Sequence, residues 1–222
     1  MNRRYRETTH PTDDQIFKIA TAAIAAFNAG YPVNLFITIQ FYVAGLGPFE
    51  AQRARQCYLK HIGDWLRKVA HVPSCYVYVF ENNPGGGLHV HILLHVPKTK
   101  LKQFHGRRQS WAKASGIPDK SCVFRSKPVG GSNDPSSKEY WRQLSWLVGY
   151  FSKGRAPGGP TDFGPKPRDQ GIVIGKRAGY SQFLGRAIPR KVPSSERKEF
   201  VRAFLSGTIP TEAHHCTKRR ER

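Results

Sequence analysis

The amino-acid sequence predicts an α+β fold: a central antiparallel sheet with helices packed on one face, followed by a basic C-terminal extension. Two observations carry this prediction. Apolar residues alternate with polar ones over segments of strand length, and they recur at helical spacing over longer segments in between. After a first helix, the elements follow the order β-α-β-β-α-β-α, in which a hairpin alternates with helical crossovers.

The first third of the chain predicts a helix, a strand and a second helix. Residues 12–28 carry apolar side chains at helical spacing, behind a Thr12 cap and two acids in the first turn. Residues 34–42 (NLFITIQFY) alternate as a strand does, and a Gly-Leu-Gly-Pro sequence ends them. Residues 49–69 repeat an apolar stripe among arginines and lysines, so we expect a long helix there.

The middle of the chain predicts an antiparallel hairpin. Residues 74–81 (SCYVYVFE) and 88–96 (LHVHILLHV) are rich in strand formers, and the six residues between them are Asn-Asn-Pro-Gly-Gly-Gly. Three further elements are expected after the hairpin: a basic helix over 97–115, a short strand over 121–127 and an amphipathic helix over 137–153.

Composition divides the chain into three parts. We expect a basic flexible arm over 1–11, a folded domain over 12–154, and a Gly/Pro-rich loop with a basic C-terminal extension over 155–222. Gly and Pro recur after Gly154 with almost no apolar periodicity. Within the extension, 171–175 fits one short strand and 194–205 a final helix.

The charge of the chain is its strongest compositional feature. The 222 residues include 36 Lys and Arg against 15 Asp and Glu, a formal net charge of +21. Such a charge indicates a polyanionic partner. The longest early apolar stretch, 19–27, is too short to span a bilayer and fits an amphipathic helix, so we expect no membrane partner and a cytoplasmic location. The cysteines form no C-x-x-C pair, which argues against a disulfide framework or a structural zinc cluster.

Two histidines of the second hairpin strand are candidate metal ligands. His89 and His91 are two residues apart on a strand, so their imidazoles project from the same face. Glu81 ends the preceding strand and comes beside them across the turn. Two histidines and one carboxylate suit a catalytic divalent ion with open coordination positions.

A tyrosine and a lysine lie one turn apart on the helix predicted over 137–153. Tyr150 and Lys153 are three residues apart and therefore share a face. Tyr150 stands at the margin of the apolar stripe, from which its side chain can reach toward the sheet. A nearby cation would make the tyrosine oxygen a stronger nucleophile by favouring the phenolate.

Taken in order, the strand LFITIQF with Thr38, the strand LHVHILL and the Tyr-x-x-Lys helix resemble the three motifs of the HUH endonucleases. The closest resemblance is to the rolling-circle replication initiator (Rep) proteins of plasmids and small viruses, and it covers residues 34–154. It implies the RRM-like Rep nuclease fold and a single catalytic tyrosine, since Trp146 occupies the position four residues before Tyr150. Tyr140 is expected to be structural.

The resemblance implies an enzyme that nicks and rejoins single-stranded DNA to start rolling-circle replication. Glu81, His89 and His91 would hold Mg²⁺ or Mn²⁺, which would act as a Lewis acid on the scissile phosphate. Tyr150 would attack the phosphorus, forming a 5′-phosphotyrosine link and freeing a 3′-hydroxyl, and Lys153 would stabilise charge. The implied setting is a bacterial or phage-infected cell.

The expected partner is single-stranded DNA, including a hairpin origin. Candidate contacts are Thr38 and Gln40 on the first strand, and Lys176, Arg177 and Arg186 in or beside the Gly-rich, basic and aromatic segment 175–185. The segment 171–176 has the wrong spacing for a P-loop. Unwinding would therefore come from a host helicase.

Three alternatives stay open at this point. A single-tyrosine transposase or a relaxase would share the chemistry. A non-catalytic RRM-like module would instead stack bases on the strand aromatics Tyr76, Tyr78 and Phe80 and would need no metal. A basic structural protein would bind weakly, with a strong dependence on salt.

Overall fold

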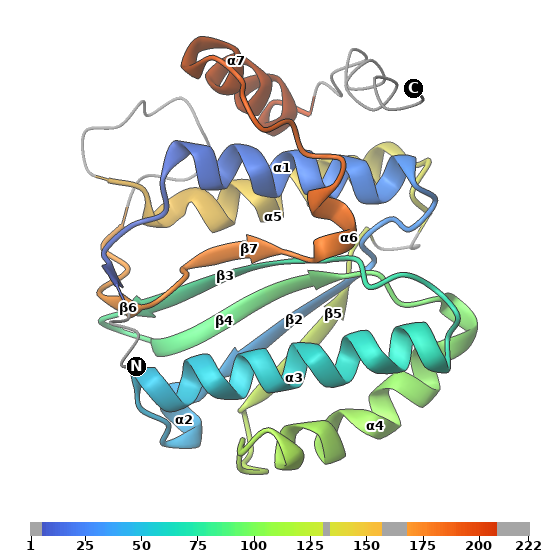
Figure 1. Cartoon of the computed structure of the whole chain (residues 1–222), viewed down its shortest axis with the longest axis vertical. Helices are drawn as coiled ribbons and strands as arrows, with labels where there is room; N and C mark the ends of the chain where they lie inside the picture. The colour runs from blue at the N-terminus through green and yellow to red at the C-terminus, as the bar shows by residue number, and fades with distance from the viewer. Residues whose placement is uncertain (1–5, 131–133, 157–167, 208–222) are drawn as a thin grey trace.

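A five-stranded sheet with the order β5-β2-β4-β3-β7 forms the centre of the fold (Figure 1). The computed structural model of the chain describes residues 6–130, 134–156 and 168–207. All neighbouring strands of this sheet are antiparallel, which confirms the α+β class and the antiparallel sheet. The strands are β2 (Leu35–Gln40), β3 (Tyr76–Asn83), β4 (Gly87–Leu94), β5 (Phe124–Pro128) and β7 (Ala178–Tyr180).

Helices cover both faces of the sheet, not one face as the sequence analysis expected (Figure 1). One face packs against α3 (Pro48–Lys68) and α4 (Leu101–Ala114), and the other packs against α1 (Asp13–Asn28) and α5 (Lys138–Phe151). The physical reason lies in the central strands, which are apolar on both sides. In β3, Tyr78 and Phe80 enter one core while Val77 and Val79 enter the other. Such a strand needs cover on both faces.

The predicted elements form with small shifts at their ends. Helix α1 begins after Thr12, whose side chain forms a capping box with Gln15. Strand β2 ends two residues earlier than expected, because Phe41 starts the short helix α2 (Phe41–Ala44), which Gly45 ends at a φ of 77°. The 3₁₀ turns η1 (Lys98–Lys100) and η2 (Ser152–Gly154) precede α4 and follow α5.

The segment after residue 167, which is part of the predicted C-terminal extension, packs against the predicted folded domain. Strand β7 pairs with β3 at the edge of the main sheet. Strand β6 (Val173–Ile174) pairs with β1 (Glu7–Thr8), which lies in the expected N-terminal arm. The short helix α6 (Gln182–Gly185) follows β7, and α7 (Ser194–Leu205) packs on the outside of α1 (Figure 1).

Several segments named in the sequence analysis cannot be compared with the structure. The first five residues of the arm, most of the Gly/Pro-rich loop and the basic tail lie outside the described residues. Cys57, Cys75 and Cys122 are free thiols. Within the described ranges, no helix combines the length and the apolar character needed to cross a membrane.

Candidate metal centre

The β3–β4 hairpin brings Glu81, His89 and His91 together. Glu81 lies directly opposite His89 in the strand register, and His91 follows two residues later on the same face. This is the face covered by α1 and α5, since Val79 and Leu93 of the same alternation belong to that core. The intervening Val90 and Ile92 are fully buried in the opposite core, as the alternation predicts.

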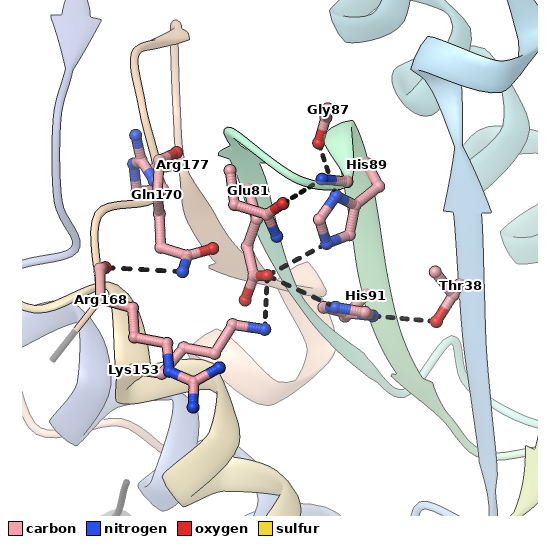
Figure 2. Close-up of polar contacts among 11 residues, drawn as sticks. Thr38, Glu81, Gly87, His89, His91, Lys153, Arg168, Gln170 and Arg177 are labelled. Atoms are coloured by element: carbon pink, nitrogen blue, oxygen red, sulfur yellow. Dashed lines mark hydrogen bonds and ion pairs between the residues drawn. The ribbon is translucent and has the colours of Figure 1, made fainter. Parts of the chain in front are cut away.

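All three side chains are buried and converge on one carboxylate oxygen (Figure 2). Glu81 Oε2 lies 3.0 Å from His89 Nε2 and 3.6 Å from His91 Nε2. The same oxygen forms an ion pair with Lys153 Nζ at 2.7 Å. The exposed fraction is 1% for Glu81, 3% for His89 and 5% for His91, so water contributes little to their solvation.

The donor set fits a divalent cation. One potential ligand atom from each of the three residues lies within 4.8 Å of the others. Glu81 Oε1 and His91 Nε2 are buried without a hydrogen-bond partner among the described residues. Buried polar atoms are normally paired, and a bound cation would supply the missing partner for such lone-pair atoms.

The outer nitrogen of each histidine ring is held in place. His89 Nδ1 donates to the carbonyl of Gly87 at 2.7 Å, which turns its Nε2 toward Glu81. His91 Nδ1 shares a hydrogen bond of 2.9 Å with Thr38 Oγ1 on β2. Such contacts behind the ligand atoms orient metal-binding histidines and fix their tautomers. Thr38, expected to contact DNA, here positions His91.

The electrostatics favour an ionised carboxylate beside a neutral imidazole. Burial by itself would raise the pKa of Glu81, but its contacts with His89 and His91 and the charge of Lys153 hold that pKa well below the usual range of a carboxyl. Burial lowers the pKa of the His91 imidazole, an effect that Glu81 partly offsets. An anionic carboxylate and an unprotonated ring nitrogen are the forms that bind metal ions.

Tyr150 and Lys153 reach the same place from the end of α5. The Tyr150 ring lies 5.4 Å from the His91 ring, measured between centroids, and makes an edge contact with it. Lys153 Nζ lies 3.3 Å from the centroid of the Tyr150 ring. Trp146, one turn earlier, is 58% exposed and stacks on Tyr150 with 5.5 Å between ring centroids.

An open pocket of about 460 Å³ lies over these side chains. Its walls include the two histidines, Tyr150, Trp146 and several residues of β2 and β5. Cross-strand register sets Arg125 of β5 opposite Thr38, and Thr38 opposite His91, in one row of the sheet. Lys127, two residues after Arg125, faces the same way, so a basic wall borders the metal ligands.

The segment 168–177 supports the site from behind. The amide of Arg168 donates to the Lys153 carbonyl, and the amide of Asn82 donates to the Gln170 carbonyl. Figure 2 shows Arg168, Gln170 and Arg177 on the opposite side of Glu81 from His91 and Thr38.

The expected DNA contacts divide into two groups. Thr38 and Gln40 line the pocket, and Gln40 Oε1 has no hydrogen-bond partner within the described part of the chain. The three basic residues after β6, which are Lys176, Arg177 and Arg186, do not line this pocket. Arg177 is fully buried and donates to the carbonyls of Thr8, Gln170 and Gly171, so it holds the chain together and presents no charge to a ligand. Lys176 and Arg186 are exposed at positions outside this pocket.

Sequence reasoning missed Arg125, Lys127 and Trp146 as pocket residues. The alternation in the β5 sequence FRSKP places Arg125 and Lys127 on one face. That pattern does not tell which strand β5 pairs with, or in which register. Tyr140 is 1% exposed and donates its hydroxyl to the Val33 carbonyl, in line with the structural role expected for it.

Comparison of the chain with models of protein families, with characterised proteins and with solved structures gives no match. The geometry of this site is therefore what supports a function for the protein.

Proposed function

We propose that the protein is a metal-dependent endonuclease that nicks and rejoins single-stranded DNA through a 5′-phosphotyrosine intermediate. The observation that carries this proposal is the meeting of Tyr150 and Lys153 with Glu81, His89 and His91 at one open pocket. A nucleic-acid-binding module has no need for a buried carboxylate and two histidines beside an accessible tyrosine. Initiation of rolling-circle replication is the use that we propose for this chemistry.

Glu81, His89 and His91 would hold Mg²⁺ or Mn²⁺ in this proposal. The ion supplies Lewis-acid activation of a phosphate oxygen at the bound strand. The protein contributes an anionic Glu81 and a His91 ring fixed by Thr38.

Tyr150 is the proposed nucleophile. Its Oη forms a bond to the phosphorus, and the bond from phosphorus to the 3′-oxygen of the preceding nucleotide breaks. The tyrosine gives up its proton and the departing oxygen takes one up, so the products are a 5′-phosphotyrosine and a 3′-hydroxyl. The step exchanges one phosphodiester bond for another, so a 3′-hydroxyl can later reverse it without ATP.

Lys153 has two roles in this scheme. Its ammonium group pairs with Glu81 and lies against the ring of Tyr150. From there it stabilises negative charge that builds up on the tyrosine oxygen and on the phosphate during attack. Because Lys153 is buried, this charge is screened little by solvent.

The pocket walls suit a single strand. Arg125 and Lys127 are exposed cations placed to contact the phosphates on either side of the reacting one. Trp146 offers an exposed ring on which an unpaired base can stack. A duplex hides the faces of its bases, so this combination favours single-stranded DNA.

The non-catalytic RRM-like alternative loses its main support. That mode of binding stacks bases on aromatic residues of an open sheet face. Tyr78 and Phe80 are 4% and 0% exposed, and α3 and α4 cover that face. Two of the three strand aromatics therefore offer no surface for stacking.

The proposal predicts metal-dependent nicking of single-stranded DNA. A fully randomised oligonucleotide pool is incubated with the protein and Mn²⁺ or Mg²⁺, and the products are sequenced from their 3′ ends. We expect cleavage at a preferred sequence that leaves extendable 3′-hydroxyls, and loss of cleavage with EDTA, His91→Ala or Tyr150→Phe. Tyr140→Phe is the matched control and keeps the activity. Tight binding of the pool without any metal-dependent cleavage would refute the enzyme and favour a binding protein.

A further inference from the structure

A second pocket lies at the edge of the sheet, away from the metal centre. It has a volume of about 500 Å³ and is bounded by α3, the residues leading into β3, and α6. We call it the edge cleft and define it by Arg55, Lys60, Arg67, Ser74, Ser181 and Arg186. Tyr76, at its border, precedes Glu81 by five residues on β3, which corresponds to roughly 16 Å along the strand.

The edge cleft contains buried polar atoms that the protein does not satisfy. Ser74 Oγ, Ser181 Oγ and Arg55 Nε have no hydrogen-bond partner among the described residues. The three side chains are 9%, 2% and 6% exposed. Ser181 precedes α6, but its hydroxyl does not cap that helix. Buried hydroxyl groups and guanidinium N–H groups without partners are rare, and a polar ligand in the cleft would supply partners for the two hydroxyls and for Arg55 Nε.

The cleft carries an excess of positive charge. Lys60 and Arg67 share one carboxylate, Asp64. Arg55 and Arg186 form no ion pair with a carboxylate among the described residues, and Arg55 is held by the amide oxygen of Gln52 at 2.8 Å. The matching ligand is therefore an anion with several acceptor oxygens, such as a phosphate ester.

Aromatic surface accompanies this charge. Phe183 is 36% exposed and Tyr76 is half-buried, and both line the cleft. The guanidinium of Arg55 lies 4.3 Å from the centroid of Tyr78, which keeps it flat against the sheet. A planar group next to the phosphate, such as a nucleobase, would stack here.

We propose that the edge cleft binds a nucleotide unit, with its phosphate at Arg55, Arg186 and Ser181 and its base against Phe183. The unit belongs either to the DNA strand, at a distance from the nicked position, or to a free nucleotide. The strand version builds on the proposed nicking activity, whereas the recognition chemistry is the same in both. No catalytic group of the metal centre lines this cleft.

The test measures binding in EDTA, so that neither the metal centre nor cleavage contributes. A labelled single-stranded oligonucleotide and free dAMP are titrated against the wild type, Arg186→Gln and Ser181→Ala. Arg107→Gln is the matched control, because Arg107 is an exposed arginine on α4 that does not line the edge cleft. Ser181→Ala removes a hydroxyl without a protein partner, so it should not destabilise the fold.

We expect Arg186→Gln to lower the slope of log affinity against log salt by about one and Ser181→Ala to weaken binding about tenfold, with Arg107→Gln less affected than either. If these effects are seen with the oligonucleotide, the nucleotide unit bound in the edge cleft is part of the DNA strand. The same effects on dAMP alone assign it to a free nucleotide. Arg186→Gln and Ser181→Ala titrations that match Arg107→Gln for both ligands would overturn the proposal.

The covalent step provides a separate readout. At saturating DNA and with Mn²⁺, the wild type and Arg107→Gln should form the same amount of protein–DNA adduct, because Arg107 lines neither the edge cleft nor the metal pocket. If neither the wild type nor Arg107→Gln forms an adduct while Arg186→Gln and Ser181→Ala still weaken binding, the nicking proposal fails and the edge-cleft proposal is still supported.

Discussion

Glu81 is the residue on which the site converges. A buried carboxylate is stable only if nearby positive charge and hydrogen bonds replace the water that it has lost. Lys153 and His89 supply these through one oxygen, and the other oxygen has no partner among the described residues. Glu81 thus links the metal ligands to the helix that carries Tyr150.

Replacing Lys153 tests this link. In Lys153→Met the Glu81 charge stays buried without its ion pair, which should lower the free energy of unfolding by about 3–5 kcal/mol in EDTA. We expect Mn²⁺ to raise the Tm of this variant more than that of the wild type, since the cation then meets no competing ammonium group. Lys60→Met, which removes an exposed ion pair, is the control and should change little. If Mn²⁺ changes the Tm of neither the wild type nor Lys153→Met, a metal site at Glu81 is contradicted.

At the residue scale, the sequence was enough to predict that Glu81, His89 and His91 meet, but not the pocket beside them. His89 and His91 share a face because they are two residues apart, and the glycine-rich turn places Glu81 opposite His89. Local rules of this kind can be applied to a sequence. Arg125 and Lys127 reach the pocket only through the pairing of β5 with β2, which depends on contacts across the whole sheet.

The hairpin turn is the element that fixes the position of His89. Gly87 has a φ of 60°, and a Cβ atom there would collide with the side chain of Tyr42. Its carbonyl accepts the hydrogen bond from His89 Nδ1. The backbone at Gly87 therefore sets both the turn and the orientation of the first histidine.

Gly87→Ala should destabilise the protein and disturb metal binding together. A left-handed backbone and the clash with Tyr42 should cost about 1–3 kcal/mol in the free energy of unfolding. Gly85→Ala is the matched control in the same turn, because no atom lies within 4 Å of its added Cβ. It should stay within about 0.5 kcal/mol of the wild type. Urea denaturation and Mn²⁺ titration of both variants check this, and equal stabilities would show that the turn tolerates a side chain at Gly87.

Most elements could be predicted from periodicity, whereas their layering could not. The strand YVYVF of β3 has almost no polar alternation, which is typical of a strand covered on both faces; the prediction of helices on one face was wrong, since the structure covers both. Strand β7 was not predicted, because a segment of only three residues, Ala178–Tyr180, is too short to show a periodic pattern. Pairing with β3 makes them a strand.

At the scale of the whole molecule, the C-terminal segment completes the fold. It adds an edge strand to the sheet, and Arg177 joins it to the carbonyl of Thr8 near the N-terminus. The amide of Phe80, next to Glu81, donates to the Arg177 carbonyl at 2.6 Å. The strand that carries Glu81 is therefore bonded to residues far beyond the Tyr-x-x-Lys helix.

Truncation tests this dependence. A chain that ends at Gly154 loses β6, β7 and α7, and it exposes the edge of β3 and the apolar surface of α1. We expect it to aggregate or to lack a cooperative unfolding transition. A chain that ends at Gly207 keeps every contact described above and should unfold cooperatively. Circular dichroism during thermal unfolding distinguishes the two. A cooperative transition in the shorter chain would show that the residues up to 154 fold as a domain of their own.

The identity of the residue that carries the DNA tests the central claim most directly. The wild-type protein is incubated with Mn²⁺ and a cleavable single strand, digested with protease and nuclease, and analysed by mass spectrometry. We predict a nucleotide joined through its 5′-phosphate to the peptide that contains Tyr150, and no such peptide from His91→Ala. A cleaved strand with a free 5′-phosphate and no modified peptide, or an adduct on a different residue, would contradict the claim.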